Sequence, residues 1–590
     1  MILLKMKKMK RIYSYIICAI CAVCGLSSCG DFLEIKSQDR IILEDFWKDK
    51  EDIDNTVAGC YLALQSSDAI SRMIVWGEGR SDEVAPGTNI NQRADLEEVL
   101  QETITAMNSY ANWEVFYKVI NRCNTVMLYA PTVAAEDPGY TQSELRATIA
   151  EMTALRSLCY FYLIRTFRDV PFTRQAFTDD DQRMDLPATP FYDVLDSLIY
   201  DLESVKNDAV RRYPDTKPLY QTGRITQDAI YAMLCEMYLW KKDYQKCISY
   251  ADLVIESKKL QLQEKRSLGR VSTNGGLSSN DERYNGFPLV SNISSTTVYG
   301  TAYQSIFVDG NSQETIFELA FNAAPKSNNM PSNSAVGELY GNSGVDQGYM
   351  APSSYVLNDV ANDNYAVYDK KTKKIDGRIY MNCNAEREAI SKFVHRDVEI
   401  TLSGAEGKPS YYSKFDTDNN PVNWIIYRLS DIMLLKAEAL AETLVESDDS
   451  TMISHNAPIL QQAFNLVSAI SKRSICKYNL EAADTLDLKD YNTKSLMREL
   501  VMKERQRELM FEGKRWYDLV RYSLRDNNTV ELSQAIQHRD GINMQYAQNF
   551  FRKMDAIFWP YSNDEVKVNT NLKQNPSYGS GENNSYQTTK

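Results

Sequence analysis

Acidic and basic side chains alternate in one segment near the C-terminus, "ERQRELMFEGKRWYDLVRY", residues 504–522. A glycosidase needs two carboxylates on either side of a cleft, so this segment is a candidate active site. Acids and arginines three residues apart are neighbours wherever a helix is continuous. The pairs at this spacing are Arg505–Glu508, Glu512–Arg515, Arg515–Asp518 and Asp518–Arg521. A cation beside each acid favours ionisation over the raised pKa of a general acid. The pattern therefore predicts a structural ion-pair network rather than a catalytic site.

Other signatures of catalysis or metal binding are weak. The three histidines are far apart and lack metal-ligand spacing. No phosphate-binding Walker loop or Gly-x-Ser-x-Gly elbow is present. Residues 416–421 begin like a calcium loop, but Pro421 replaces the required glycine and Tyr427 replaces the bidentate acid. We therefore expect no enzyme activity and no cofactor, and an irregular surface calcium site stays open.

Tyrosine is the residue type that best fits a binding function. The chain has 37 tyrosines and 19 phenylalanines, and tyrosine joins a flat apolar ring to a polar hydroxyl. A pyranose has a face rich in C–H groups and a rim of hydroxyls, so a tyrosine near amides, acids or arginines suits it. Tyrosines within helical patterns are expected to lie in the core. The ligand-binding candidates lie in Gly- and Asn-rich segments: Tyr284, Tyr299, Tyr303, Tyr340 and Tyr349.

Two helix-rich blocks must carry these side chains. Apolar residues recur every three or four positions in residues 149–166, which predicts a long helix, and Pro171 follows its end. Residues 224–257 predict a helix, a short polar turn at 241–243 and a second helix. Small residues and a tyrosine stand where a tetratricopeptide repeat packs its two helices, namely Cys235, Tyr238, Cys247 and Ala251. Residues 427–474 repeat this shape. We predict a mainly α-helical fold of stacked, tetratricopeptide-like helix pairs.

The middle of the chain differs from these blocks. Residues 261–425 hold 13 of the 25 glycines, together with many Ser, Asn and Tyr. Short β-like runs such as residues 315–321 are separated by turn signals. A disordered segment would be poor in aromatic residues, so we interpret this region as functional loops. A helical scaffold is thus expected over residues 29–260 and 426–590, with a loop-rich, short-β-containing ligand-binding half over 261–425.

The N-terminus has the features of an export signal. Five Lys and Arg residues lie within residues 5–11, and an apolar stretch follows over residues 12–26. That stretch is shorter than the ~20 residues of a membrane-spanning helix, so a secretory signal fits better. Small residues precede the single Cys29, as at a bacterial lipoprotein cleavage site. We expect residues 1–28 to be a lipoprotein signal peptide, and acyl chains such as palmitate on Cys29 to hold the protein on a membrane.

Charge and cysteine usage exclude further classes. The net charge is −13, and removal of the basic signal makes it more negative. An acidic surface repels nucleic acid, so we expect no nucleic-acid partner. Four of the 11 cysteines belong to the signal and anchor. The other seven are scattered through apolar helical patterns, which predicts buried free thiols rather than a disulfide framework.

Five segments together resemble the RagB/SusD family and are spread over nearly the whole chain after the signal. They are "CGDFLEIKSQD", "NWEVFYKVINRCNTVM", "AEMTALRSLCYFYLIRTFRDVPF", "ERQRELMFEGKRWYDLVRY" and "WPYSNDEVKVNTNLKQNPSY". The fourth is the most specific match. The third ends in the family's aspartate–valine–proline turn, although Arg168 stands where a glycine is usual.

The resemblance implies a single domain over residues 29–590, built on four tetratricopeptide-like helix pairs. It also implies an outer-membrane lipoprotein that captures a polysaccharide or oligosaccharide and presents it to a SusC-like TonB-dependent transporter as a lid. Acidic residues after Cys29 resemble the surface-export signal of Bacteroidetes lipoproteins, so the chain is expected to face the cell exterior. In the family a loop after an "SDE"-like stretch, here residues 81–83, reaches the ligand, which nominates Asn89.

Three other functions stay open. Parts of the RagB/SusD family handle oligopeptides, so the ligand of this chain would then be a peptide. A surface glycoside hydrolase and a helical-repeat scaffold that binds only proteins are the other two. The anchor, the family segments and the tyrosine-rich middle favour a non-enzymatic glycan-binding lipoprotein.

Overall fold

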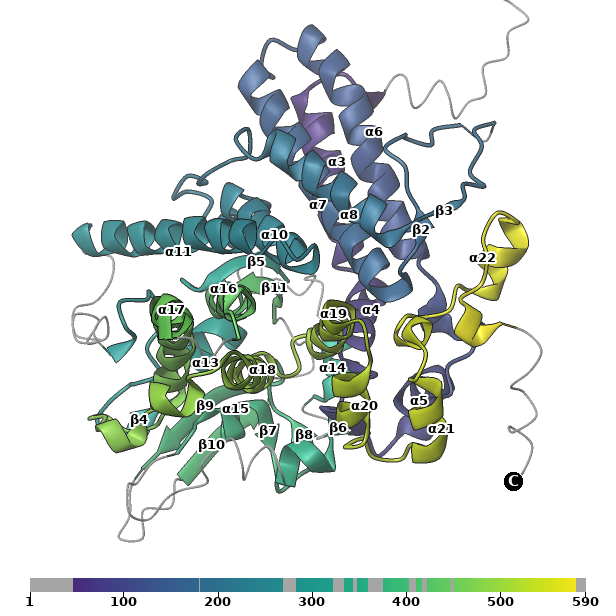
Figure 1. Ribbon diagram of the computed structural model, residues 1–590. Coiled ribbons are helices and arrows are strands. Elements are labelled where there is room, and N and C mark those ends of the chain that lie inside the picture. The colour runs from purple at the N-terminus through teal and green to yellow at the C-terminus, as the bar shows by residue number, and fades with distance from the viewer. Residues whose placement is uncertain are drawn as a thin grey trace, which may run out of the picture.

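The computed structural model describes residues 46–179, 181–268, 283–321, 334–342, 347–358, 375–402, 410–415, 422–446 and 450–579. Cys29 and the calcium-like residues 416–421 lie outside these ranges. Helices dominate the architecture and make up 59% of it (Figure 1). The mainly α-helical, tetratricopeptide-like fold predicted from the sequence is confirmed.

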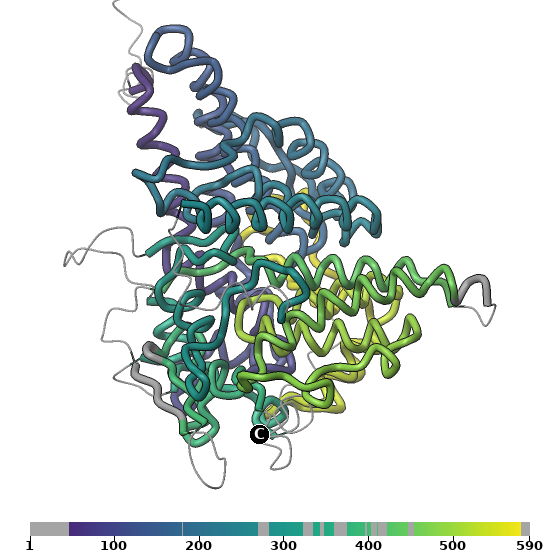
Figure 2. The backbone as a smooth tube through the Cα atoms, turned by 90° about the vertical axis from the view of Figure 1, so that its left-hand side faces the viewer, coloured from purple at the N-terminus to yellow at the C-terminus, as the bar shows by residue number. Residues whose placement is uncertain are grey.

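The long helices stack side by side through the molecule. In the N-terminal block α6 packs on α7, and α7 on α8; the next pair is α10 and α11, and α11 packs on α16, which contacts α17 and α18. Figure 2 shows the N-terminal block above and the C-terminal helices below it. The main helices are α3 (Lys50–Leu64), α4 (Ser67–Glu78), α5 (Ala94–Leu100), α6 (Glu114–Glu136), α7 (Gln142–Phe167), α8 (Phe191–Val205), α9 (Tyr220–Gly223), α10 (Gln227–Trp240), α11 (Tyr244–Ser267), α14 (Ser334–Tyr340), α15 (Arg378–Asn382), α16 (Leu429–Thr443), α17 (Ser450–Ser474), α18 (Lys494–Leu509), α19 (Arg515–Asp526), α20 (Val530–Ile536), α21 (Met544–Phe550) and α22 (Asn563–Val568).

The α10–α11 pair shows how the sequence sets a helical unit. The turn at residues 241–243 places Lys242 at φ 65°, and the Asp243 side chain caps α11 by accepting the Lys246 N–H at 3.2 Å. The small Cys235 and Cys247 let the helices approach until their sulfur atoms are 3.6 Å apart. The predicted helix–turn–helix is confirmed.

The thiols behave as the sequence predicts. All seven cysteines after Cys29 are free and buried. Burial raises the pKa of the Cys383 and Cys476 thiols well above the usual value, because a thiolate loses its hydration in an apolar interior. These residues act as small apolar core side chains.

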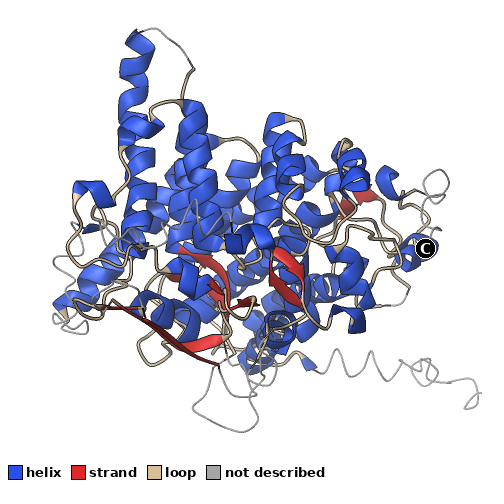
Figure 3. Ribbon diagram, turned by 90° about the horizontal axis from the view of Figure 1, so that it is seen from below, coloured by secondary structure: helices blue, strands red, loops and turns tan. Residues whose placement is uncertain are grey.

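The strands are short, and those of the described residues form five small antiparallel sheets at separate places in the molecule (Figure 3). The predicted strand at residues 315–321 is present as β5, which pairs with β11 beneath α10 and α16. The strands are β1 (Val84–Pro86) with β6 (Met350–Pro352), β2 (Val170–Pro171) with β3 (Ala188–Thr189), β4 (Val298–Tyr299) with β9 (His395–Thr401) and β10 (Ser410–Phe415), β5 (Thr315–Leu319) with β11 (Trp424–Arg428), and β7 (Cys383–Asn384) with β8 (Ala389–Ile390).

The end of α4 and the segment after it dock onto the turn between α18 and α19. A Cβ atom at Gly77 would lie 2.0 Å from the Gly513 carbonyl oxygen, so only glycine permits this approach. The Arg515 guanidinium donates two hydrogen bonds of 2.8 Å to Asp82. The "SDE" stretch is therefore tied to the segment that most resembles the family, and all three of its residues are buried.

Two buried glutamates face each other at this junction. Glu78 accepts the Gly513 and Lys514 backbone N–H groups at 2.9 and 3.3 Å. Burial raises the pKa of Glu78 to about 7, and burial together with the Glu78 charge raises the pKa of Glu83 well above its usual value. The pair therefore holds a proton in the folded state.

Arg168 sits in a strained turn after α7. Its φ and ψ are 69° and −83°, and the Asp169 N–H donates to the Phe167 carbonyl at 3.1 Å, which closes a γ-turn of the rare positive-φ type. This conformation explains why glycine is usual here in the resembling family. The Arg168 side chain forms ion pairs with Asp169 and Asp555 at the surface.

A pair of substitutions at Arg168 separates backbone strain from the ion pairs. Both Arg168→Ala and Arg168→Gly remove the ion pairs, but only glycine relaxes the turn. We expect Arg168→Gly to be more stable than Arg168→Ala by about 1 kcal/mol, measured by urea unfolding. Equal stability of the two variants would show that the turn is unstrained.

Replacement of Glu78 by glutamine should alter the pH dependence of stability. Because the folded pKa of Glu78 is raised to about 7, its contribution to stability is complete below pH 4.5 and is lost as pH rises towards 7. Across this window we expect the free energy of unfolding of the wild type to fall by about 1 kcal/mol per pH unit relative to that of Glu78→Gln. Urea unfolding at pH 5, 6, 7 and 8 measures the difference, with the exposed Glu114→Gln as control. Parallel curves for wild type and Glu78→Gln would contradict the protonated pair.

Candidate functional site

The segment around β1 meets the segment around β6, which is far away in the chain, through the short β1–β6 ladder. Val84 pairs with Pro352, and Pro86 pairs with Met350. The Gly87 N–H extends the pairing by donating to the Tyr349 carbonyl at 2.9 Å. A Cβ atom at Gly87 would lie 2.1 Å from the Gly348 carbonyl oxygen, so glycine is required for this contact. The loops after β1 and before β6 are therefore held side by side.

Side chains of these two loops and of α14 form one partly exposed surface, which we call the β1–β6 face. The Arg93 guanidinium lies 5.4 Å over the Tyr349 ring, and Arg93 also pairs with Glu338. Gln347 accepts the Thr88 N–H at 2.7 Å and donates to the Glu388 carbonyl at 2.6 Å. The face consists of Thr88, Asn89, Arg93, Glu338, Gln347 and Tyr349.

Two of the predicted site residues lie on the segments joined here: Asn89 follows Thr88, which Gln347 contacts, and Tyr349 lies two residues after Gln347. Asn89 is exposed, and its side chain makes no hydrogen bond within the described part of the chain. Tyr349 is half-buried, with Arg93 against its ring. A ring, an amide and a guanidinium at one surface can supply a stacking plane and hydrogen bonds together. Ligand contact by Asn89 and Tyr349 stays a prediction.

The sequence nominated four other tyrosines as ligand platforms, but the structure buries all four. Their rings are at most 1% exposed, because the segments that carry them, including β4 with Tyr299 and α14 with Tyr340, pack into the core. The Tyr303 hydroxyl lies 2.8 Å from the Ser391 carbonyl, and the Tyr340 hydroxyl donates to the Phe511 carbonyl at 3.0 Å. A ring without an exposed face cannot stack on a sugar. The four core residues are Tyr284, Tyr299, Tyr303 and Tyr340.

Sequence reasoning missed Arg93, Glu338 and Gln347. Arg93 lies only four residues after Asn89, and its spacing from a predicted loop residue was the one available signal. Glu338 and Gln347 reach the face through the pairing of β1 with β6. Such pairing between distant segments leaves no local pattern in the sequence.

The acid–arginine segment forms an ion-pair network, as predicted, but with different partners. Asp518–Arg521 is present at 2.8 Å. The other three predicted pairs are wrong. Glu512 lies beyond the end of α18 at Leu509 and so is not on one helix with Arg515, whereas Arg505–Glu508 and Arg515–Asp518 each lie within one helix but reach partners in other segments. Glu508 pairs with Arg378, Arg428 and Arg473; Glu512 pairs with Arg428 and Lys392; Arg505 pairs with Asp431 and Asp518; Arg515 pairs with Asp82.

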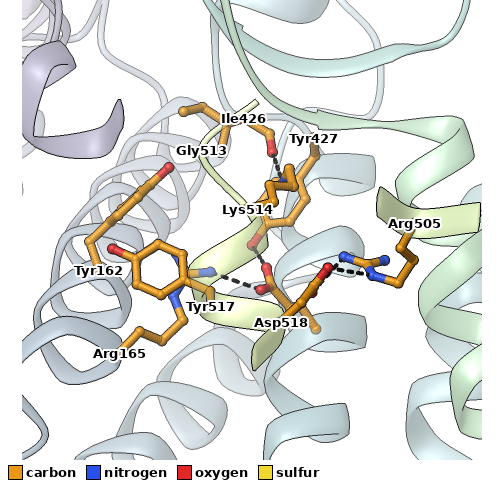
Figure 4. Close-up of a pocket in the computed structure, with 10 residues that line it drawn as sticks. Tyr162, Arg165, Ile426, Tyr427, Arg505, Gly513, Lys514, Tyr517 and Asp518 are labelled. Atoms are coloured by element: carbon orange, nitrogen blue, oxygen red, sulfur yellow. Dashed lines mark hydrogen bonds and ion pairs between the residues drawn. The ribbon is translucent and has the colours of Figure 1, made fainter. Parts of the chain in front are cut away.

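These carboxylates are held in their charged forms. Nearby cations, opposing burial, lower the pKa of Asp431 to about 2 and lower the pKa of Glu508 well below its usual value. Figure 4 shows Arg505 forked on Asp518 beside Lys514 and Tyr427. The space among them is about 10 Å³, which holds about one water molecule. This pocket is too small for a sugar, and its ionised acids are unsuited to general-acid catalysis.

The described ranges contain neither a metal-binding cluster nor a membrane-spanning helix. Within them no group of three or more His, Cys, Asp or Glu side chains is arranged to hold a metal ion. The described helices also include none that is both long and apolar enough to cross a bilayer.

Comparison with known sequences points to one family. Residues 391–578 match the model of the SusD family. A SusD-like protein of Formosa agariphila is 25% identical over 584 residues, covering 97% of this chain and 100% of the relative. A second SusD-like protein of that organism is 21% identical over 87% of this chain and 89% of its own length.

Solved structures share the fold. A SusD superfamily protein of Bacteroides vulgatus superposes with a TM-score of 0.61 at 18% identity, covering 90% of this chain and all of the other. A laminarin-binding SusD-like protein superposes with a TM-score of 0.57 at 18% identity, with the same coverage. The family-model match over residues 391–578, the relatives that span nearly the whole chain and the shared fold together support the SusD/RagB family for this protein.

Proposed function

We propose that this protein is a cell-surface glycan-binding lipoprotein that captures an oligosaccharide or polysaccharide on the β1–β6 face. The single observation that carries the proposal is the grouping of an exposed amide, a half-buried tyrosine ring and a guanidinium, at Asn89, Tyr349 and Arg93. Similarity to the SusD/RagB family and a laminarin-binding relative of the same fold support a sugar as ligand.

The chemistry of this face suits reversible capture. Stacking of a sugar on Tyr349 adds roughly 0.5–1.5 kcal/mol beyond the area it buries, and each hydrogen bond adds about the same. A few such contacts give affinities from about micromolar to millimolar. Weak binding lets the protein release its cargo to a transporter.

Delivery to a SusC-like TonB-dependent transporter is the second part of the proposal, and it follows from the family. Anchoring through acylated Cys29 at the outer membrane, facing the exterior, would place the protein beside such a barrel. Catalysis has no part in this function, since bond cleavage is left to other proteins.

Alanine substitutions on the face test the ligand site. We expect Tyr349→Ala and Asn89→Ala each to weaken glycan binding by about 2- to 12-fold, the loss of one stacking contact or hydrogen bond. Affinity electrophoresis and isothermal titration against a panel of plant, host and microbial polysaccharides that includes laminarin measure this.

A matched control is Tyr200→Ala, which removes a tyrosine that is 72% exposed on α8, away from the face. Equal losses from Tyr200→Ala and Tyr349→Ala would refute the assignment of the face. If the protein bound peptides and no glycan, its ligand would be a peptide rather than a sugar. Release of reducing sugar ends by the purified protein would show a hydrolase instead.

Substitution of Cys29 tests the anchor. We expect Cys29→Ser to shift the protein from the outer-membrane fraction to a soluble fraction, because the acyl chains supply the membrane affinity. Metabolic labelling with a radioactive fatty acid should fail in the variant, while its circular dichroism spectrum stays unchanged. Labelling of Cys29→Ser equal to the wild type would rule out this site of acylation.

A further inference from the structure

A polar cleft opens between α11, α9 with the loop before it, and the loop that leads into β5. Its volume is about 260 Å³, close to the ~300 Å³ at which small-molecule sites begin. The cleft shares no lining residue with the β1–β6 face, and Figure 1 shows α11 projecting at one side of the molecule, away from β6. We call it the α9–α11 cleft.

Lys258 lines this cleft, and it is unusual because it is buried without an ion pair to any described residue. Its side chain is 4% exposed, and its ammonium donates to the Thr315 carbonyl at 2.6 Å. Every other buried lysine or arginine of the described residues has a carboxylate partner, such as Glu512 for Lys392 at 2.6 Å. Lys258 alone among them has no ion pair. A buried charge without a counter-charge is costly, which indicates that an anion completes the site.

A second cation faces the same cleft. Lys265 lies seven residues after Lys258, on the same side of α11. Burial and the neighbouring Arg212 lower the pKa of Lys265, while Arg212 itself is paired with Glu264. Lys265 also has no ion pair in the described ranges. Asp215 also lines the cleft and opposes the lowering of the Lys265 pKa. The cleft therefore presents two cations without ion pairs among the described residues, Lys258 and Lys265, beside one further acid.

The uncharged lining of the cleft suits a sugar. The Tyr213 ring is half-buried and stands edge-on to Tyr220, with ring centres 5.6 Å apart. Gln221 accepts the Tyr213 N–H at 3.1 Å, Gln261 donates to Asp228 at 2.8 Å, and Gln313 donates to the Pro288 carbonyl at 3.0 Å. Each amide thus uses one end within the described chain and leaves the other end for hydroxyl groups.

We propose that the α9–α11 cleft is a second ligand site, which binds the carboxylate or sulfate group of an acidic sugar through Lys258 and Lys265. The choice of a sugar rests on the proposed glycan-binding function, whereas the choice of an anion rests on the unpaired Lys258. The site would give the protein a preference for acidic glycans that the β1–β6 face does not supply.

Binding should depend on pH through Lys258. Burial lowers the pKa of Lys258 to about 8, so the ammonium is charged at pH 7 and loses its proton towards pH 9. The charged groups that act on it are Asp228 of α10, Lys265 of α11, and Glu314 and Glu318 around β5. We expect the affinity for an anion to fall about tenfold between pH 7 and pH 9.

Titration calorimetry with three probes tests the proposal: oligogalacturonate, sulfated galactan oligosaccharide and neutral laminari-oligosaccharide. We expect Lys258→Met to weaken the acidic probes at least tenfold, to leave the neutral probe unchanged and to abolish the pH dependence. The control is Lys259→Met on the next residue of α11, which lies near Glu256 and Phe287 instead. The pH profile of the wild type provides a second readout that needs no variant.

The outcomes separate the two proposals. Acidic probes that bind Lys258→Met as tightly as wild type, or a wild-type affinity unchanged from pH 7 to 9, would overturn the α9–α11 site and leave the β1–β6 face standing. If Tyr349→Ala abolishes binding of acidic and neutral probes alike, the face is the one site and the cleft proposal fails. If no probe or polysaccharide binds the wild type, the glycan-binding function itself fails.

Discussion

Pairing of buried charges, to which Lys258 is the exception among the described lysines and arginines, is the constraint on which this fold depends. A carboxylate or guanidinium taken into the interior loses several kcal/mol of hydration, which is recovered only when an opposite charge and further hydrogen bonds lie close by. Arg428 contacts both Glu508 and Glu512, and Glu508 also meets Arg378 and Arg473. These residues come from the middle of the chain and from the C-terminal helices. The network therefore fixes how the irregular middle sits on the helical scaffold.

The same constraint explains the segment that most resembles the family. Arg515 and Gly513 serve to hold Asp82 and Glu78, which lie 433 and 435 residues away in the chain. The strongest sequence signature is thus a structural junction rather than part of the binding surface. Residues that contact a ligand can vary around it without disturbing the junction.

Sequence reasoning succeeded where the information is local. The spacing of apolar residues predicted α7, and the polar residues 241–243 predicted the turn between α10 and α11. It failed where partners are distant in the chain. Arg515, for example, was predicted to pair with Glu512 and Asp518 but pairs with Asp82. Composition also misled, since Tyr299 and Tyr340 sit in Gly- and Asn-rich segments yet are buried. Asn89 and Tyr349 were nominated separately, and only the β1–β6 pairing shows that they share a surface.

The β1–β6 ladder has a consequence for how fast and how selectively a ligand is held. Three residue pairs close a loop in which the contacting residues Thr88 and Gln347 are 259 positions apart. The entropy lost in closing such a loop belongs to folding, so a ligand meets groups that are already oriented. Preorganisation of this kind removes a conformational step from the encounter, and differences between ligands then reside in their rates of dissociation.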